Sequence, residues 1–333
     1  MDIRESVLRH YGLVVSSLDL MSTGRVNRTY KLCADDGNTY CLKVYSDAVT
    51  DKRLYDGLEV TSYLIPLGFP VPRVVPTAAG DLVLVVDRLR LLLLRFLPGR
   101  NLALDEVGRA EGLGMGAMLG KLHHSLRFFP QADKLHNSLW RGSEESLPRL
   151  FDLLTTVQSK DRHDDFDYFT ISSLTYRIQV MQGVDVGPRQ FFHLRRQAIH
   201  GDYQLGNVLF DAHGTVAGVL DFDQTCYSFP AWELMRAIGF TCLRDGKFNY
   251  PLAAAMLKGY RDGGGMLAPS EYLEMPRLWY YQLVRGLFGF SDHYAGTPDP
   301  RQDEAAYGRH HAMVWLGQNM AELRAFIWDT TRH

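Results

Sequence analysis

Three side chains in one stretch of the sequence have the types and the spacing to do chemistry together: Asp202, Asn207 and Asp221. The residues between the last two have a hairpin pattern, because an apolar run at 208–210 is followed by turn residues and a second strand-like run at 215–220. Closing that hairpin brings its ends together, so we expect Asn207 and Asp221 to lie side by side. Asp202 comes just before the first strand, at the same end. The sequence therefore predicts one amide and two carboxylates at one edge of a small sheet.

A cluster of this composition suits a hard cation such as Mg²⁺, which prefers oxygen ligands and leaves room for phosphates. It favours phosphoryl transfer, which needs a metal to neutralise phosphate charge and a carboxylate to orient the attacking hydroxyl. We expect Asn207 and Asp221 to hold Mg²⁺, because they end the two strands. We expect Asp202 to accept the hydroxyl proton as the catalytic base.

A cation for the phosphates is available in the N-terminal part of the chain. Lys43 stands at the centre of a strand-like run at 39–45, and a helical pattern follows at 52–67. Glu59 lies beside the apolar stripe of that helix, so it could point inward and pair with Lys43, directing the ammonium group toward phosphates. An exposed strand lysine and a boundary glutamate facing water fit the same pattern, and both alternatives stay open.

The elements around these residues predict an α+β fold with two lobes. A small, β-rich N-terminal lobe, residues 1–97, is expected to bind the nucleotide, and Pro98-Gly99-Arg100 marks its end. A larger, mainly helical lobe, residues 98–333, is expected to carry the catalytic and acceptor-binding groups. Strands are expected within 18–45 and at 81–86 and 90–96; helices are expected at 2–11, 106–126, 166–182, 231–242, 252–261, 270–290 and 304–327.

A polar loop at residues 22–29 lies between two of the expected strands. A loop of this composition can offer backbone N–H groups to phosphates, but it has a single Gly and matches neither phosphate-loop formula. A plain hairpin connection is the alternative.

Length, charge and cysteine content exclude several classes of protein. The chain has 333 residues, 46% of them hydrophobic and 22% charged, with a net charge of −2. This balance gives no basic field for nucleic acid or an acidic membrane. The four cysteines are too scattered for a disulfide framework, and no run is long enough to span a bilayer. We expect a cytoplasmic protein, monomeric or homodimeric, that acts on a small molecule and binds neither nucleic acid nor membrane.

The central stretch resembles the aminoglycoside phosphotransferase and choline kinase family. The resemblance lies in His200-Gly201-Asp202, in Asn207 five positions after the Asp, and in Val219-Leu220-Asp221-Phe222. It extends over roughly residues 20–295 and implies a protein-kinase-like fold with ATP and Mg²⁺ as cofactors. It also implies that Lys43 with Glu59 serves the phosphates, and that the backbone of Arg95 and Phe96, in Leu94-Arg95-Phe96, receives adenine.

Three positions bear on the family pattern. Gln204 stands where protein kinases carry a lysine, so positive charge must come from Mg²⁺, Lys43 or the substrate. Glu233 occupies the place of an Asp that braces the catalytic loop, and we expect it to be structural. Asp223 shares a strand face with Asp221 if the strand continues, but the family pattern gives it no role, so it is expected to be peripheral.

Within the family, the C-terminal helical block resembles the kinase-like homoserine kinases, in Gly259-Tyr260-Arg261 and in the aromatic-rich helix after Met275. This implies an acceptor pocket lined by the last helices. Arg285 is the leading candidate, because a single Arg in an apolar helix invites a carboxylate or phosphate partner. Packing in the helical core is the alternative for the aromatic residues. The candidates for the acceptor pocket are Arg285, Trp279, Tyr280 and Asp292.

The expected function is transfer of the ATP γ-phosphate to a hydroxyl of a small metabolite: a homoserine-like hydroxy amino acid, an amino alcohol or a sugar derivative. An antibiotic phosphotransferase of the aminoglycoside type is the second interpretation. A non-catalytic, nucleotide-binding scaffold on a kinase fold is the third, although Lys43, Asp202, Asn207 and Asp221 are all present.

Overall fold

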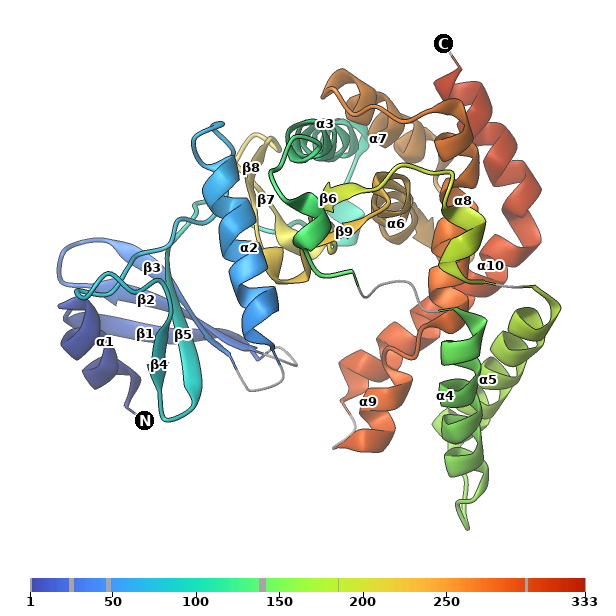
Figure 1. The fold of residues 1–333 in the computed structure, drawn as a ribbon, viewed down its shortest axis with the longest axis horizontal. Helices are drawn as coiled ribbons and strands as arrows, with labels where there is room; N and C mark the ends of the chain where they lie inside the picture. The colour runs from blue at the N-terminus through green and yellow to red at the C-terminus, as the bar shows by residue number, and fades with distance from the viewer. Residues whose placement is uncertain are drawn as a thin grey trace. The chain divides into compact units, whose positions relative to one another are not determined.

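The structure, a computed structural model, describes residues 2–23, 27–45, 49–137, 142–184, 186–296 and 299–332 (Figure 1). The chain divides into two compact units, and neither is continuous in sequence. We call the first the sheet unit; it comprises Met1–Glu106, Phe129–Gln131 and His200–Thr225. We call the second the helical unit; it comprises Val107–Phe128, Ala132–Ile199 and Cys226–His333.

The sheet unit is built on five antiparallel strands in the order β1-β2-β3-β5-β4. The first three neighbours are consecutive in sequence, and β5 pairs with β3 after the chain has passed through α2 and β4. The strand-rich N-terminal region was predicted, and this sheet confirms the predicted α+β fold class. The elements are α1 (Ile3–Tyr11), β1 (Val15–Thr23), β2 (Asn27–Ala34), β3 (Thr39–Tyr45), α2 (Asp51–Leu64), β4 (Leu84–Val86) and β5 (Leu89–Arg95).

Alternate side chains of β3 face two different cores, as the two-residue period of a strand requires. One set packs with α1, and the other lies on the face that α2 covers. Lys43 belongs to the second set, so its ammonium group is on the α2 side of the sheet. The first set is Tyr40, Leu42 and Val44, and the second is Cys41, Lys43 and Tyr45.

The stretch His200–Thr225 packs with the sheet unit rather than with the helices on either side of it in sequence. It contains the predicted hairpin, formed by β7 (Val208–Phe210) and β8 (Val216–Val219). Arg100 and Phe210 form an isolated β-bridge, which ties the hairpin to the chain just after β5. The predicted division at residue 97 treats the lobes as consecutive segments, whereas the compact units are interleaved along the chain.

The helical unit contains most of the predicted helices, with shifted ends. The helix expected at 270–290 ends at Arg285 as α8, and the short helix α9 begins only at Phe290. The region 130–165 contains α4, which sequence reasoning did not assign. Short strands β6 and β9 pair with each other and were also missed. The elements are α3 (Arg109–Leu126), α4 (Ser143–Gln158), α5 (Asp165–Gly183), β6 (Gln197–Ile199), β9 (Cys226–Ser228), α6 (Pro230–Cys242), β10 (Leu243–Arg244), β11 (Lys247–Phe248), α7 (Tyr250–Asp262), α8 (Pro269–Arg285), α9 (Phe290–Ala295) and α10 (Pro300–Thr331).

A seam of glycines lets α3 and α7 pack backbone against backbone. A Cβ at Gly116 would lie 2.1 Å from the Met256 carbonyl oxygen, and one at Gly259 would lie 2.1 Å from that of Leu113. Glycines four residues apart share one helix face, so the sequence spacing builds this contact. The seam also includes Gly112, Gly120 and Gly263.

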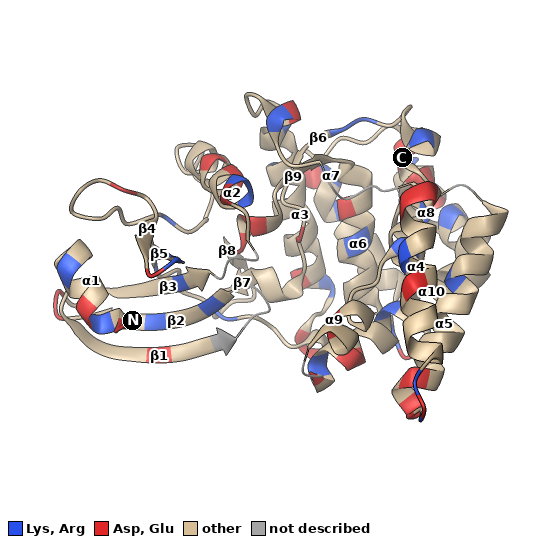
Figure 2. Cartoon of the chain, turned by 60° about the horizontal axis from the view of Figure 1, so that its bottom comes forward, with Lys and Arg blue, Asp and Glu red and all other residues tan. Residues whose placement is uncertain are grey.

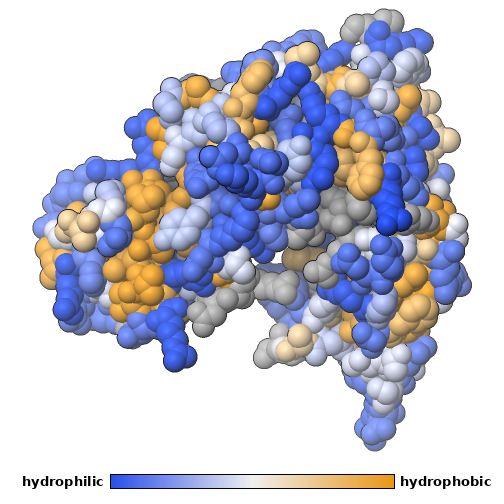
Figure 3. Space-filling model, in the orientation of Figure 1, coloured by the Kyte–Doolittle hydropathy of each residue, from blue (hydrophilic) through white to orange (hydrophobic). Residues whose placement is uncertain are grey.

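The outer surface carries both signs of charge over the elements of both units (Figure 2). Some large apolar side chains are exposed; on the sheet unit these include Val85 at 65% and Leu82 at 42%, and Figure 3 shows apolar side chains gathered over this unit. In the described part of the chain, every helix is too short or too polar to cross a bilayer.

Candidate active site

The hairpin brings Asn207 and Asp221 together as predicted. Val208 pairs with Val219, and the Leu220 N–H donates to the Asn207 carbonyl over 2.8 Å. The two residues therefore lie at adjacent strand ends, both on the rim of the same pocket. Asp221 has φ 64° and ψ 67°, a left-handed conformation that Asp tolerates better than most residues and that ends the strand here.

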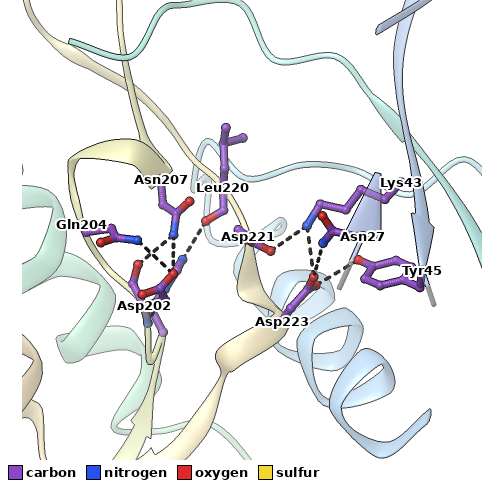
Figure 4. A network of polar contacts seen from close by, with 10 residues as sticks. Asn27, Lys43, Tyr45, Asp202, Gln204, Asn207, Leu220, Asp221 and Asp223 are labelled. Carbon is purple, nitrogen blue, oxygen red and sulfur yellow. Dashed lines mark hydrogen bonds and ion pairs between the residues drawn. The ribbon is translucent and has the colours of Figure 1, made fainter. Parts of the chain in front are cut away.

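Asp202 is held by two side-chain amides (Figure 4). Asn207 Nδ2 donates to the Asp202 carbonyl at 2.8 Å and to Asp202 Oδ2 at 3.0 Å. Gln204 Nε2 donates to the same carboxylate oxygen at 3.2 Å. Because the Asn207 nitrogen is committed to Asp202, its amide oxygen is left to face a cation. Gln204, the departure from the protein-kinase lysine, thus orients the carboxylate rather than supplying charge.

His200 fastens the catalytic loop to the hairpin. Its ring is fully buried; Nδ1 accepts the Asp202 N–H at 3.2 Å, and Nε2 lies 2.8 Å from the Leu220 carbonyl oxygen. Acceptance at Nδ1 assigns the proton to Nε2, which donates to that carbonyl. Gly201, between them, has φ +82°, where a side chain would be strained. The His-Gly-Asp order therefore has a conformational reason at each position.

Asn101 is a further support for this loop that sequence reasoning missed. Its Nδ2 donates to the carbonyl oxygens of Gly206 and Val208, each at 2.9 Å. An asparagine just after the Pro98-Gly99-Arg100 break was the available signal, but its partners are about 100 residues away in sequence and could not be inferred locally.

Lys43 lies between two carboxylates. Its Nζ is 2.6 Å from Asp221 Oδ1 and 3.2 Å from Asp223 Oδ2. Burial disfavours the ammonium ion, but Asp223 and then Asp221 raise the pKa of Lys43 well above its ordinary value. Burial likewise opposes ionisation of Asp221, yet the charge of Lys43 lowers the pKa of Asp221 to about 2. Both groups are therefore charged at neutral pH.

Asp223 is central to the site, although it was expected to be peripheral. Its carboxylate accepts hydrogen bonds from Tyr45 Oη at 3.0 Å and from Asn27 Nδ2 at 3.4 Å, besides the contact with Lys43. Burial, together with the neighbouring Asp221, raises the pKa of Asp223, and Lys43 acts in the opposite sense. The strand ends before Asp221 and a turn of 3-10 helix follows at Phe222–Gln224, so this turn, and not a strand period of two, brings both carboxylates to Lys43.

The structure does not bring Glu59 to Lys43. Glu59 is exposed on α2, whose pocket-facing side instead presents Leu54, Gly57, Leu58 and Thr61. The rotation of α2 follows from its close approach to the chain after Asp221, since a Cβ at Gly57 would lie 2.8 Å from the Phe222 carbonyl oxygen. The apolar stripe predicted that Glu59 lies at the border of the core. It did not predict whether the Glu59 side chain points toward Lys43 or toward solvent.

Lys43, Asn207, Asp221 and Asp223 line a pocket of about 580 Å³ within the sheet unit. This volume lies in the range of small-molecule and cofactor sites. Its lining combines apolar side chains, among them Leu92, Leu94 and Leu209, with the polar groups around Lys43. Residues 24–26 of the predicted phosphate loop fall outside the described residues, but Met21, Asn27 and Thr29 on either side of them line this pocket.

The predicted adenine-binding segment lines the same pocket. The Arg95 N–H donates to the Arg73 carbonyl at 2.8 Å, and the Phe96 N–H donates to that of Thr39 at 3.2 Å, so neither is left for a base. Leu97 follows; within the described residues its N–H has no hydrogen-bond partner, and Leu97 lines the pocket. The backbone N–H of Leu97, directly after this segment, is therefore available to an adenine ring.

The predicted acceptor residues belong to the helical unit and have different environments there. Trp279 is fully buried, and it packs so closely on Gly239 that a Cβ there would lie 2.1 Å from the ring. This places Trp279 in the core, because a side chain held on all sides has no face for a ligand. Arg285, at the end of α8, is 8% exposed, Tyr280 Oη lies 3.4 Å from Tyr176 Oη, and Asp292 is half-buried on α9.

Glu233 is structural, in line with expectation, through a buried chain of hydrogen bonds. Glu233 Oε2 lies 2.9 Å from His123 Nε2, and His123 Nδ1 lies 2.9 Å from Tyr260 Oη. All three side chains are nearly inaccessible to solvent. The chain links α6, α3 and α7, so His123 is a packing residue of the helical unit.

Comparison with known proteins identifies the class to which this fold and site belong. A family model described as the phosphotransferase enzyme family, APH, matches residues 19–272. The chain therefore belongs to the APH phosphotransferase family, and it is an ATP-dependent small-molecule kinase that acts on a hydroxyl group. The family resemblance expected from the central stretch is confirmed.

Among individual relatives, a homoserine kinase of Caulobacter vibrioides (strain NA1000 / CB15N) is 26% identical over 261 residues, which cover 78% of this chain and 76% of that protein. An aminoglycoside phosphotransferase from Alicyclobacillus acidocaldarius subsp. acidocaldarius DSM 446 has a similar structure, with a TM-score of 0.67, 15% identity, and coverage of 98% of this chain and 97% of that one. The microcompartment-associated aminopropanol kinase gives a TM-score of 0.66, 18% identity, and coverage of 96% and 98%. At these identities the two structures confirm the kinase-like fold alone.

Proposed function

We propose that this enzyme transfers the γ-phosphate of ATP to the hydroxyl of a small hydroxy amino acid or amino alcohol, with a homoserine-like acceptor first among them. The observation that carries the proposal is the arrangement of Asp202, Asn207 and Asp221 at one end of the hairpin. Lys43 contacts Asp221 there and lines the same pocket. The relative named above as homoserine kinase supports the class of acceptor.

In this proposal Asp202 is the base. Asn207 and Gln204 fix its carboxylate, so it can accept the proton of the acceptor hydroxyl as the oxygen attacks the γ-phosphorus. Lys43 holds the phosphates of ATP, and adenine lies against Leu97 in the same pocket. Orientation by these groups supplies much of the rate gain, because the loose transition state needs little covalent help.

The donor set fits a magnesium ion at Asn207 and Asp221. An ionised carboxylate and an amide oxygen are hard oxygen ligands, and Mg²⁺ usually keeps water and substrate phosphates as its other ligands. In the described part of the chain no group of three or more His, Cys, Asp or Glu forms a metal cage, which agrees with a site completed by the nucleotide. Magnesium bound there would neutralise charge on the transferring phosphate.

For the acceptor we propose Arg285 as the residue that binds its carboxylate, with Tyr280 and Asp292 as further candidates. A guanidinium group suits this role because its fork matches a carboxylate in a bidentate manner. Arg285→Ala should raise the KM for a carboxylate-bearing acceptor by about tenfold or more, the usual effect of losing a charged contact. The KM for ATP should change little, and Arg301→Ala, in the exposed pair with Asp299, serves as control.

The experiment that tests the function is an ADP-release screen with homoserine, hydroxylysine, aminopropanol, small sugars and a panel of aminoglycosides. Turnover highest with a hydroxy amino acid or amino alcohol supports the proposal. Preferred turnover of an aminoglycoside would transfer the assignment to an antibiotic phosphotransferase. Tight ATP binding without turnover of any acceptor would favour the non-catalytic scaffold.

A further inference from the structure

We propose that Asp223, and not a glutamate on α2, is the positioning residue that holds Lys43 on the phosphates of ATP. The inference rests on the phosphotransferase activity of the family and on the proposed role of Lys43. Asp223 Oδ2 lies 3.2 Å from Lys43 Nζ, and the two side chains are 14% and 13% exposed (Figure 4). Glu59, the candidate from the family pattern, is exposed on α2.

The geometry shows why one carboxylate would not suffice. Lys43 Nζ is closest to Asp221 Oδ1, at 2.6 Å, but Asp221 is also the carboxylate proposed to bind magnesium. A carboxylate engaged with a divalent ion has less charge available for an ammonium group. Asp223 makes the second contact from two residues further along, so Lys43 keeps a partner when Asp221 serves the metal.

Asp223 is itself held in place by the strands that carry the lysine. Tyr45, two residues after Lys43 on the same face of β3, donates to Asp223 Oδ1 at 3.0 Å. Asn27, the first residue of β2, donates to Asp223 Oδ2 at 3.4 Å. Three donors from two neighbouring strands thus converge on one buried carboxylate. Such a group orients its partners more firmly than a flexible glutamate at a helix surface.

The close approach of α2 to the chain at Phe222 leaves no space there for a glutamate side chain between α2 and Lys43. Gly57 faces the Phe222 carbonyl at a distance that leaves no room for a Cβ, so α2 contacts the chain between Asp221 and Asp223 directly. The segment that carries Asp223 therefore occupies the position between α2 and Lys43. The motif Asp-Phe-Asp at 221–223 combines metal binding and lysine positioning in a single turn.

A double-mutant cycle tests the proposal, with kcat/KM for ATP and the dissociation constant of ADP as readouts. Asp223→Asn keeps the size and an acceptor oxygen but removes the charge; it should lower kcat/KM by about 10- to 100-fold, as a misplaced catalytic group does. In a Lys43→Met background the same change should cost less than about twofold, because the group it positions is gone. Glu59→Gln, the rival carboxylate, should stay within about twofold of the parent.

Three other outcomes of these measurements would count against the proposal or against the role of Lys43 on which it rests. Equal losses from Asp223→Asn with and without Lys43 would overturn the proposal, since Asp223 would then act independently, for example as a second metal ligand that raises the magnesium requirement. A large loss from Glu59→Gln would also overturn it. If Lys43→Met itself left turnover unchanged, the proposed role of the lysine would fail instead, which separates the two claims.

A second variant protects the test against a failure to fold. Tyr45→Phe removes the hydroxyl group that donates to Asp223 and keeps the aromatic ring on β3. It should reduce kcat/KM several-fold when Lys43 is present and leave it unchanged in the Lys43→Met background. Unfolding temperature and ADP affinity of each variant show whether the pocket remains intact; a loss of turnover that tracks only the unfolding temperature, with additive effects in the cycle, would contradict the proposal.

Discussion

Asn207 Nδ2 lies 3.0 Å from Asp202 Oδ2, so the amide proposed to face the metal also holds the proposed base. The two roles are therefore coupled through one side chain. A change at Asn207 should affect both the orientation of Asp202 and the metal requirement, which a purely structural amide would not.

Asn207→Ala should lower kcat by about 100-fold, the typical cost of removing one group that positions or stabilises the transition state. It should also raise the magnesium concentration needed for half-maximal rate. Steady-state rates over a magnesium titration measure both effects. Asn319→Ala, which removes an amide on α10 bonded to the Trp315 carbonyl, is the matched control. A reduced rate with an unchanged magnesium requirement would argue against a ligand role.

Asn101→Ala should lower kcat several-fold without changing the KM for ATP greatly. Its amide supports the carbonyls of Gly206 and Val208, and each lost hydrogen bond costs about 1 kcal/mol where water can replace the donor. The expected cause is a less well-positioned loop around Asn207. Unfolding in urea, measured beside the kinetics, separates loop positioning from loss of stability; an unchanged kcat would show that the loop does not need this support.

Gly116→Ala should destabilise the helical unit by about 2 kcal/mol or more, because its Cβ would collide with the Met256 carbonyl oxygen in the α3–α7 seam. Gly308→Ala on α10 is the control, since a Cβ there meets nothing within 4 Å. That substitution should raise the free energy of unfolding by up to about 1 kcal/mol, as a helical Gly→Ala change usually does. Thermal unfolding of both variants checks the contrast, and equal effects would show that the seam is not tight.

His310 should make stability depend on pH. Its Nδ1 lies 2.9 Å from Ser173 Oγ, and burial, followed by the charge of Arg177, lowers the pKa of His310 to about 4 from an ordinary value of 6.5. Between these two pH values the unfolded chain binds a proton that the folded chain does not, so the free energy of unfolding falls as pH falls from about 6.5 to about 4.

The partial exposure of the ring limits this contribution to the order of 1 kcal/mol. Urea unfolding at pH 7 and pH 5 measures it, and in His310→Gln the difference between the two pH values should shrink by that amount. An identical pH dependence in the two proteins would rule out this assignment.

The sequence predicted the catalytic hairpin well because its information is local. The apolar runs and turn between Asn207 and Asp221 determine which residues meet, and the structure has that geometry. The sequence did not show that the Phe96 N–H of the predicted adenine-binding segment donates to the Thr39 carbonyl, because this contact depends on the pairing of β3 with β5.

The partners of Lys43 could not be predicted, because they depend on contacts between segments nearly 180 residues apart. The period of α2 placed Glu59 at the edge of an apolar stripe, but the rotation of that helix is set by Gly57 against Phe222. The contacts of Asn101 with Gly206 and Val208 are also long-range and could not be predicted from local sequence. In each case long-range packing, rather than local propensity, selects which polar group reaches the site.

The central claim is that Asp202 is the base of an ATP-dependent transfer to a small hydroxyl acceptor. The most direct measurement compares Asp202→Asn with the parent enzyme for phosphate transfer from ATP to the best acceptor, together with the dissociation constant of ADP. We expect Asp202→Asn to lose transfer by about 100-fold or more, as for removal of a general base, with ADP affinity within a few-fold of the parent. Transfer at the parent rate in Asp202→Asn would contradict the central claim.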